Sequence, residues 1–230
     1  MNKLQNTFNS MFAIALLFSA FTVIAQESKD SVEEVVVTGS YIKGSATDGA
    51  SPVEIIGRDT IEDLGATSVA DITKNISVNS GSENNADSFT QGSTQGTSSI
   101  NLRGLGLSST LVLVDGRRHT IAAGTANDGS VFVDTNSIPV IALERVEVLK
   151  EGAAAIYGSD AVAGVVNYIL RRDFTGMEFD ISKQETDLGS QTDDRVGVIW
   201  GKELGNSNVV MAYSQLDRSP LGGENLTKYS

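Results

Sequence analysis

The stretch IALERVEVLKEGAAAIYGSDAVAGVVNYILRR, residues 141–172, decides the fold of this chain. Its first half contains RVEVLK (145–150), whose valine and leucine residues indicate a strand. Just before the stretch, Pro139 is typical of the first position of a short helix. Residues 152–169 are rich in glycine and alanine, and such small residues let backbone segments approach each other closely. We therefore expect a short helix, a strand and a closely packed segment in this part of the chain.

Towards the N-terminus, short apolar segments predict one strand and two helices. PVEII (52–56) is a candidate strand. Between residues 57 and 76, apolar residues recur at roughly helical spacing, but Gly65 interrupts the series. Ser68 is a suitable N-cap, with Asp71 three residues further on. We expect two short helices in this region rather than one long helix.

The run STLVLVDGRR (109–118) is almost continuously apolar until it reaches Asp115-Gly116. Residues 111–114 indicate a strand that is buried on both faces, and the Asp-Gly pair is the turn that ends it. SINLRGLG (99–106) alternates apolar and polar residues just before this run.

Downstream of the opening stretch, three segments alternate apolar and polar residues. They are GMEFDIS (176–182), DRVGVIWGK (194–202) and NVVMAYSQ (208–215). Three such segments in a row predict an antiparallel meander with one apolar and one polar face. Trp200 and Tyr213 suit the lipid–water boundary of an outer-membrane barrel. A soluble β-sheet would show the same alternation, and the three segments alone favour neither.

The N-terminus resembles an export signal. The apolar run 11–25 is shorter than the roughly 20 residues that a membrane-spanning helix needs. Val23 and Ala25 supply small residues before a cleavage site, so we predict a signal peptide over residues 1–25, cut before Gln26, rather than an uncleaved membrane anchor. The chain is then an exported protein.

Composition excludes several functional classes. The chain has 17 basic and 29 acidic residues, and residues 1–25 contain one lysine and no acid, so the processed chain has 16 basic against 29 acidic residues and a net charge of −13. This balance disfavours nucleic acid and anionic membrane surfaces as partners. The absence of cysteine excludes disulfides and thiolate metal sites. The one histidine, His119, lies beside a turn and is expected to be a solvated loop residue, so we predict no metal site and no cofactor.

The tail between the signal peptide and residue 51 is polar, apart from EEVVVTGS (33–40). Three consecutive valines there indicate a short strand within a flexible linker. On the residues alone, this segment is either an edge strand of the following domain or a peptide offered to a partner.

In order along the chain, these motifs resemble the N-terminal half of the TonB-dependent outer-membrane receptors. EEVVVTGS looks like the TonB box, SVADITKNI is similar to an early plug helix, and INLRGLG and TLVLVDGRR look like paired plug strands. The opening stretch resembles the closing signature of the plug. In SVADITKNI, Ser77-Val78-Asn79 follow where the family has glycine and proline after the helix.

The resemblance implies an α+β plug domain, with a small mixed β-sheet, short helices and long loops, followed by the first antiparallel strands of a transmembrane β-barrel. It divides the chain into a signal peptide (1–25), a linker with the TonB box (26–51), a plug (52–172) and the start of the barrel (173–230). It also implies a location in the outer membrane of a Gram-negative bacterium, in contact with outer-membrane lipid, with the plug and the TonB box reaching the periplasm. The implied activity is TonB-powered uptake of a scarce solute, such as a siderophore-bound iron, cobalamin or an oligosaccharide.

The resemblance assigns roles to individual residues. The residues expected to pair with a strand of the periplasmic domain of TonB are Glu33, Glu34, Val35, Val36, Val37 and Thr38. Arg103 and Lys150 match plug positions that pair with acids of the barrel wall. Lysine at the second position is a departure from the family, because it replaces a forked donor with a point charge. A plain surface role is the alternative for both.

By the same analogy, the polar loops 81–99 and 119–131 reach the extracellular side of the plug and contact a small-molecule solute or metal chelate. Their candidate contact residues are Asn84, Asn85, Phe89, Gln91, Gln95, Asn127 and Asp128. The alternative interpretation is that these are ordinary loop residues without a role in binding.

Other functions find less support. RGLGLSS lacks the third glycine of a dinucleotide-binding loop, no G-x-S-x-G elbow is present, and Asp115 is explained by its turn, so we expect no enzymatic activity. A soluble periplasmic binding module built from a plug-like domain is the main alternative. About three strands fit after residue 175, so we expect an N-terminal fragment of a larger receptor, or otherwise a truncated product with an unpaired sheet edge.

Overall fold

The computed structural model describes residues 53–80, 94, 96–151, 153–185 and 191–219. The predicted signal peptide, linker and TonB box lie outside the described residues. So do five of the predicted solute-contact residues, Asn84, Asn85, Phe89, Gln91 and Gln95.

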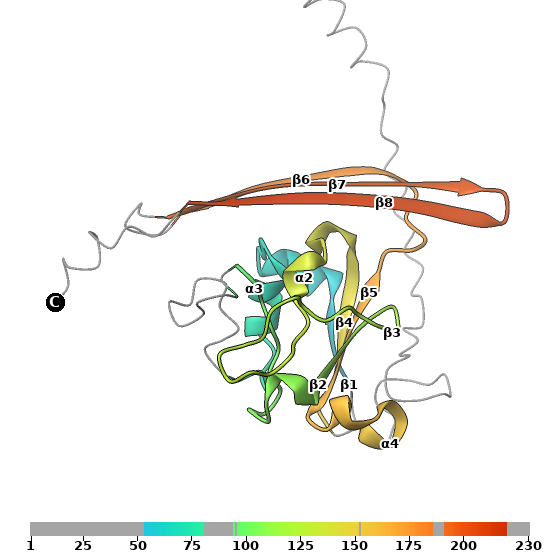
Figure 1. Cartoon of the computed structure of the whole chain (residues 1–230). Helices are drawn as coiled ribbons and strands as arrows, with labels where there is room; N and C mark the ends of the chain where they lie inside the picture. Colours follow the sequence, from blue (N-terminus) through green and yellow to red (C-terminus); the bar gives the residue numbers. More distant parts are fainter. Residues whose placement is uncertain (1–52, 81–93, 95, 152, 186–190, 220–230) are drawn as a thin grey trace, which may run out of the picture. The chain divides into compact units, whose positions relative to one another are not determined.

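A five-stranded mixed sheet forms the first part of the described chain (Figure 1). Its strand order is β1-β4-β5-β2-β3, with β2 and β5 parallel and the other neighbours antiparallel. The bounds of its strands are β1 Val53–Gly57, β2 Thr110–Val114, β3 Arg117–Arg118, β4 Leu143–Leu149 and β5 Gly164–Leu170. The predicted strands at 52–56, 111–114 and 145–150 are therefore confirmed to within one or two residues.

Short helices connect these strands. They are α2 Arg58–Asp63, α3 Val69–Lys74, α4 Ala154–Tyr157 and the 3-10 helices η2 Leu107–Ser109, η3 Thr135–Ser137, η4 Val140–Ala142 and η5 Ser159–Ala161. The two predicted helices on either side of Gly65 are thus confirmed, and Gly65 has a φ of +57° in the connection between them. Pro139 lies immediately before η4, as its N-cap, rather than at the first helical position.

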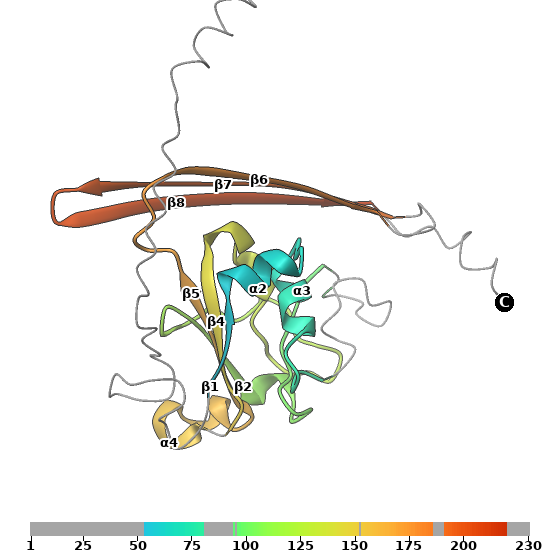
Figure 2. The ribbon, with the colours of Figure 1, turned by 180° about the vertical axis from the view of Figure 1, so that it is seen from behind.

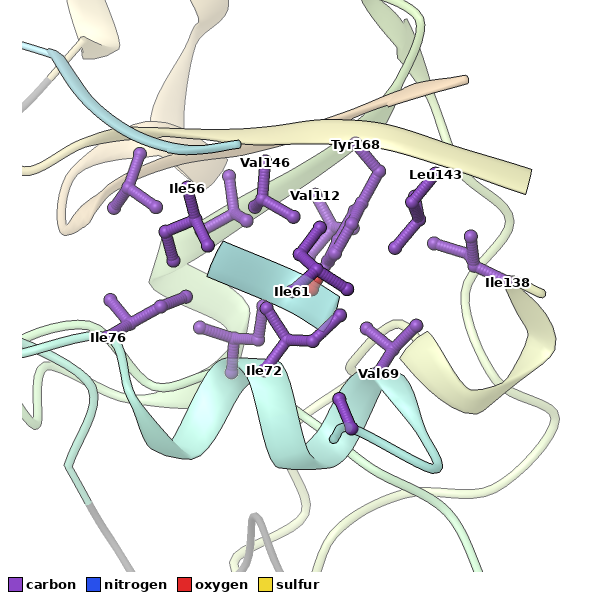
Figure 3. Packing of buried hydrophobic residues seen from close by; sticks show 14 of the residues in the cluster. Ile56, Ile61, Val69, Ile72, Ile76, Val112, Ile138, Leu143, Val146 and Tyr168 are labelled. Carbon is purple, nitrogen blue, oxygen red and sulfur yellow. The ribbon is translucent and has the colours of Figure 1, made fainter. Parts of the chain in front are cut away.

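Both faces of the mixed sheet are covered. On one face, Ile61 of α2 and Ile72 of α3 pack against Val112, Val146 and Tyr168 (Figure 3). Figure 2 shows α2 and α3 from behind, in a view where they lie in front of the sheet. On the other face, a second cluster of buried residues consists of Leu111, Leu113, Leu149, Ala153, Ala161 and Val165. Strand β2, between β5 and β3, is buried on both faces, as its unbroken apolar run predicts.

The prediction of a strand at INLRGLG, paired with TLVLVDGRR, is wrong. Within residues 99–106, Leu102 forms only an isolated bridge with Asn79. Arg103 and Gly104 both have positive φ, +57° and +67°, so the chain turns where a strand would continue. The hydrogen-bonded neighbours of β2 are instead β5 and β3.

Helix α3 is fixed at its N-terminus by Asp71, as the sequence predicts. The Asp71 carboxylate accepts hydrogen bonds from the backbone N–H and the hydroxyl of Ser68, both at 3.0 Å, and from the Thr67 hydroxyl at 2.9 Å. Lys74 Nζ lies 3.2 Å from its other oxygen. Burial raises the pKa of Asp71, but the Lys74 charge and the hydrogen bonds from Thr67 and Ser68 together hold that pKa below its ordinary value.

Replacement of Asp71 by asparagine is expected to destabilise the domain by about 1 kcal/mol at neutral pH, because the cap and its charge are weakened. A carboxylate with a lowered folded-state pKa contributes stability above its unfolded pKa, and the contribution is lost as the pH falls through the folded pKa. The difference between wild type and Asp71→Asn should therefore shrink below about pH 3.8. Thermal unfolding followed by circular dichroism between pH 3 and pH 7 measures it, and a difference that stays constant over this range would contradict the assignment.

A second, three-stranded antiparallel sheet follows, in the order β6-β7-β8. Its strands are β6 Gly176–Glu185, β7 Thr192–Leu204 and β8 Ser207–Arg218. The predicted meander is confirmed, including which residues share a face. No helix among the described residues is long and apolar enough to span a membrane.

Candidate functional site: the junction between the mixed sheet and strands β6–β8

The apolar face of strands β6–β8 is exposed. The pairing register places Phe179, Val198 and Tyr213 side by side in one row, and Met177, Trp200 and Met211 in the next. Phe179 is 68% exposed and Ile181 is 81% exposed. This arrangement is the reverse of a sheet in a water-soluble domain, which buries its apolar face.

Charged residues bound this apolar face along the strands. One row of neighbours consists of Lys183, Asp194 and Asp217, and Lys202 follows the apolar residues at the other end of β7. Asp194 and Lys202 are eight residues apart, which corresponds to about 26 Å along a strand. Strands of outer-membrane barrels are tilted by about 35–45°, so this length corresponds to roughly 20 Å across the membrane, somewhat less than the roughly 25 Å height of the apolar band of such barrels.

The polar face of β6 binds the preceding domain through Glu178. Arg171, just after β5, places two guanidinium nitrogens 3.0 and 2.8 Å from the two carboxylate oxygens. Arg58, the first residue of α2, places Nη2 3.4 Å from the same carboxylate. The Arg171 guanidinium also lies 4.3 Å from the centre of the Phe174 ring. One acid of the strand thus joins two arginines that are far apart in the sequence.

Arg58 has further acceptors within its own domain. Its Nε donates to Glu62 at 2.6 Å, and its Nη1 donates to the carbonyls of Val140 and Leu143 at 3.1 and 3.2 Å. Arg171 reaches the carbonyl between these two, that of Ile141, at 3.3 Å. Both arginines therefore hold η4 and the start of β4 while binding Glu178.

A second set of polar contacts lies further along the strands. Arg195 of β7 binds both carboxylate oxygens of Asp180 at 2.8 Å and donates to the carbonyl of Ala66 at 2.7 Å. Gln184 donates to the neighbouring carbonyl of Gly65 at 3.1 Å. Arg58, Gly65, Ala66, Asp180 and Arg195 are among the residues that line a cavity of about 390 Å³.

Two glycines on the inner face of β7 allow close contact. A Cβ at Gly197 would lie 3.4 Å from Ile141, which is only 2% exposed. A Cβ at Gly201 would lie 1.9 Å from the carbonyl oxygen of Phe174. Strand β7 therefore has room for the Ile141 side chain of η4 at Gly197 and for the backbone of Phe174, just before β6, at Gly201.

The sequence reasoning missed Arg58, Arg171, Glu178 and Arg195. The available signal was the polar face of the meander, on which Glu178, Asp180 and Arg195 alternate with apolar residues. That pattern indicates charges on one face, but it does not indicate which residues of the preceding domain they bind.

Arg103 and Lys150 are occupied within the mixed-sheet domain. The Arg103 guanidinium donates to the carbonyls of Val162 and Ala163 at 3.0 to 3.3 Å. Lys150 Nζ lies 2.9 Å from Glu54 and 3.0 Å from the Ser77 hydroxyl. Their predicted contact with a barrel wall stays a prediction.

The described parts of the two predicted solute loops approach each other at Thr94 and Gly124, where an added Cβ would lie 3.3 Å from the Thr94 methyl group. The end of the first loop is also hydrogen-bonded to the segment that follows the second loop, around η3. Asn136 donates to the carbonyl of Gly96 at 3.0 Å, and Asp134 accepts from the backbone N–H of Ser98 at 3.0 Å. Of the predicted solute-contact residues, Asn127 and Asp128 are exposed at the tip of this region. Asp128 accepts two hydrogen bonds from Ser130, at 2.8 Å each, and the bond from the Ser130 backbone foremost lowers the pKa of Asp128. Solute contact by these residues stays a prediction.

Among the described residues, no group of three or more histidine or acidic side chains is arranged to hold a metal ion. The buried Tyr168 has a pKa raised by desolvation, which keeps its hydroxyl neutral within the core.

Comparisons with known proteins agree with this architecture. The family model of the TonB-dependent Receptor Plug Domain matches residues 45–165. The iron-regulated outer membrane virulence protein of Vibrio cholerae serotype O1 is 30% identical over 164 residues, covering 70% of this chain and 23% of that protein. The chain thus spans about a quarter of the length of the curated relatives that it matches.

Solved structures of similar fold are receptors and transporters. The siderophore receptor PirA from Acinetobacter baumannii matches with a TM-score of 0.55 and 26% identity, over 71% of this chain and 24% of that one. The ferric citrate transporter FecA in its unliganded form matches with a TM-score of 0.60 over 76% of this chain and 26% of that one, and its 22% identity bears on the fold alone. The mixed sheet with its covering helices is therefore a plug followed by antiparallel strands, and the chain belongs to the TonB-dependent receptor plug domain family.

Proposed function

We propose that this chain acts in the energy-coupled uptake of a scarce solute across the outer membrane of a Gram-negative bacterium, with TonB as its periplasmic partner. One observation carries the proposal: strands β6–β8 turn their polar face to the plug and their apolar face outward. Lipid is the solvent that such an apolar face fits. The same observation disfavours a soluble periplasmic binding module, which would leave this face in water.

The length of the connections supports an orientation in the membrane. Strands β7 and β8 are joined by Gly205 and Asn206 alone, whereas residues 186–191 separate β6 from β7. Outer-membrane barrels have short periplasmic turns and longer extracellular loops. We therefore assign Gly205 to the periplasmic side. Asn208, next to this turn, donates to the carbonyl of Arg172 at 2.7 Å, so the exit from the plug lies at the same side.

For the solute, a ferric chelate is the class that the relatives support. Their names describe an iron-regulated protein and a siderophore receptor. Cobalamin and oligosaccharides remain the alternative classes. We further propose that residues 1–25 are a signal peptide and that Glu33 to Thr38 pair, strand to strand, with the periplasmic domain of TonB.

A peptide of residues 31–41 tests the proposed TonB contact. It is expected to bind the periplasmic domain of the host's TonB, and Val36→Pro is expected to abolish binding, because proline removes a backbone N–H that strand pairing needs. Val36→Ile, which keeps the β-branched shape, is the matched control and should bind like wild type. Calorimetry or NMR titration measures the affinities. Equal affinity of the wild-type and Val36→Pro peptides would refute pairing through this segment.

A further inference from the structure

Strand β1 lies at an edge of the plug sheet and pairs with β4 alone among the described strands. Its five residues are half-buried except for Ile56, which is buried. It is also the first described element after the predicted TonB box. A load that arrives from the N-terminal side therefore meets β1 first, and the first residue pair that it reaches is Val53 with Leu149.

The strand ends at Gly57, and the next residue, Arg58, is held by more side-chain contacts than the strand itself. The guanidinium of Arg58 binds four acceptors: Glu62, Glu178 and the carbonyls of Val140 and Leu143. Since these contacts share one side chain, a load on the Arg58 backbone acts on all of them together. By contrast, within the described part of the chain β1 makes one side-chain ion pair, between Glu54 and Lys150.

The acceptors of Arg58 are themselves held in place. Arg171 binds the carbonyl of Ile141 and both oxygens of Glu178. Ile141 packs against Gly197 of β7, and Glu178 belongs to β6. Arg58 thus connects the end of β1 to a part of the plug that is fixed to two strands of the following sheet.

We propose that Arg58 is a mechanical stop, which divides the plug into an extractable strand, β1, and a retained remainder. The inference rests on the proposed function, because TonB would supply the load through residues 33–38. Under that load β1 leaves the sheet and the chain is held at Arg58. The length released from the plug is then five residues, roughly 17 Å of extended chain. Arg58 acts as a positioning residue and contacts no solute.

Single-molecule pulling tests the stop without requiring TonB. Residues 1–230 contain no cysteine, so Ser51→Cys adds the one thiol of this part of the protein, as a handle for pulling on the protein in outer-membrane fragments from its host. The Ser51→Cys protein is expected to show two separate ruptures: a weak one for β1 and a stronger one at Arg58. In the protein that carries both Ser51→Cys and Arg58→Ala, the two ruptures are expected to merge. The first step then lengthens by roughly 11 residues, from Arg58 through α2 to the capped start of α3. A trace of Arg58→Ala that keeps the separate second rupture would overturn the proposal.

Three further variants complete the experiment. Arg58→Lys keeps the charge but has a single nitrogen for four acceptors, so its second rupture should be weaker than wild type and still present. Glu178→Gln should weaken the same rupture, which keeps the test valid if Arg58→Ala fails to fold. Arg118→Ala is the matched control, because Arg118 binds Asp160 and the carbonyl of Tyr157 away from β1, and its trace should equal wild type.

Equal second ruptures in Arg58→Lys, Glu178→Gln and wild type would also overturn the proposal. Loss of peptide affinity for TonB would refute the proposed function and leave these traces unchanged.

Discussion

Replacement of Gly164 by alanine is expected to destabilise the plug by at least about 3 kcal/mol, a large part of the 5–15 kcal/mol that ordinarily stabilises a domain. Gly164 begins β5 with a φ of +140°, a conformation that alanine rarely adopts. An added Cβ would lie 2.4 Å from the carbonyl oxygen of Leu149 and 2.7 Å from a methyl group of Leu102. Since Leu149 is part of the neighbouring strand β4, the clash is relieved only by separating β4 from β5.

Protease resistance of the plug and its thermal unfolding, in protein purified from outer membranes, measure this effect. Gly106→Ala is the matched control, because Gly106 also has a positive φ, +98°, but no atom lies within 4 Å of its Cβ position. Its cost is expected to be that of the backbone conformation alone, about 1–3 kcal/mol. Equal losses in the two variants would show that close packing at Gly164 contributes nothing.

Replacement of Phe179 by arginine is expected to block assembly into the outer membrane. Phe179 lies in the middle of the outward apolar face, beside Val198 in the register. A charge at the midplane of a lipid-facing strand costs about 2–4 kcal/mol, whereas an exposed substitution in water usually changes stability by less than about 0.5 kcal/mol. This one variant therefore separates a lipid-facing sheet from a soluble one.

Outer-membrane fractions that are probed for folded, heat-modifiable protein provide the measurement. Asp217→Arg is the control, because Asp217 lies on the same face but in the charged row with Asp194. It should assemble like wild type. Normal assembly of Phe179→Arg would place this face in water and would contradict the proposed membrane location.

The local elements of this fold could be read from the sequence, because each depends on neighbours in the chain. Gly65 separates two helices, and Ser68 caps the second together with Asp71. Asp115 and Gly116 form the predicted turn with φ values of +51° and +75°, which suit a hairpin connection. The alternation of the last three segments correctly predicted which of their residues share a face of the sheet, since the side-chain period of a strand is two residues.

Local pattern failed where the backbone conformation depends on distant partners. SINLRGLG alternates like a strand, yet Arg103 and Gly104 turn the chain, and the place beside β2 is taken by β5, in parallel. Leu111 pairs with Val165 across more than fifty residues, and no local signal specifies such a partner.

By itself, the sequence determined the short elements, the two-faced meander and the resemblance to a plug, because periodicity, turn residues and ordered motifs are properties of the chain alone. Only the tertiary structure decided that the apolar face of the meander points outward and that Arg58 and Arg171 share Glu178. The physical reason is that an ion pair depends on the distance between two charges in space, and here those charges lie as many as 120 residues apart in the chain.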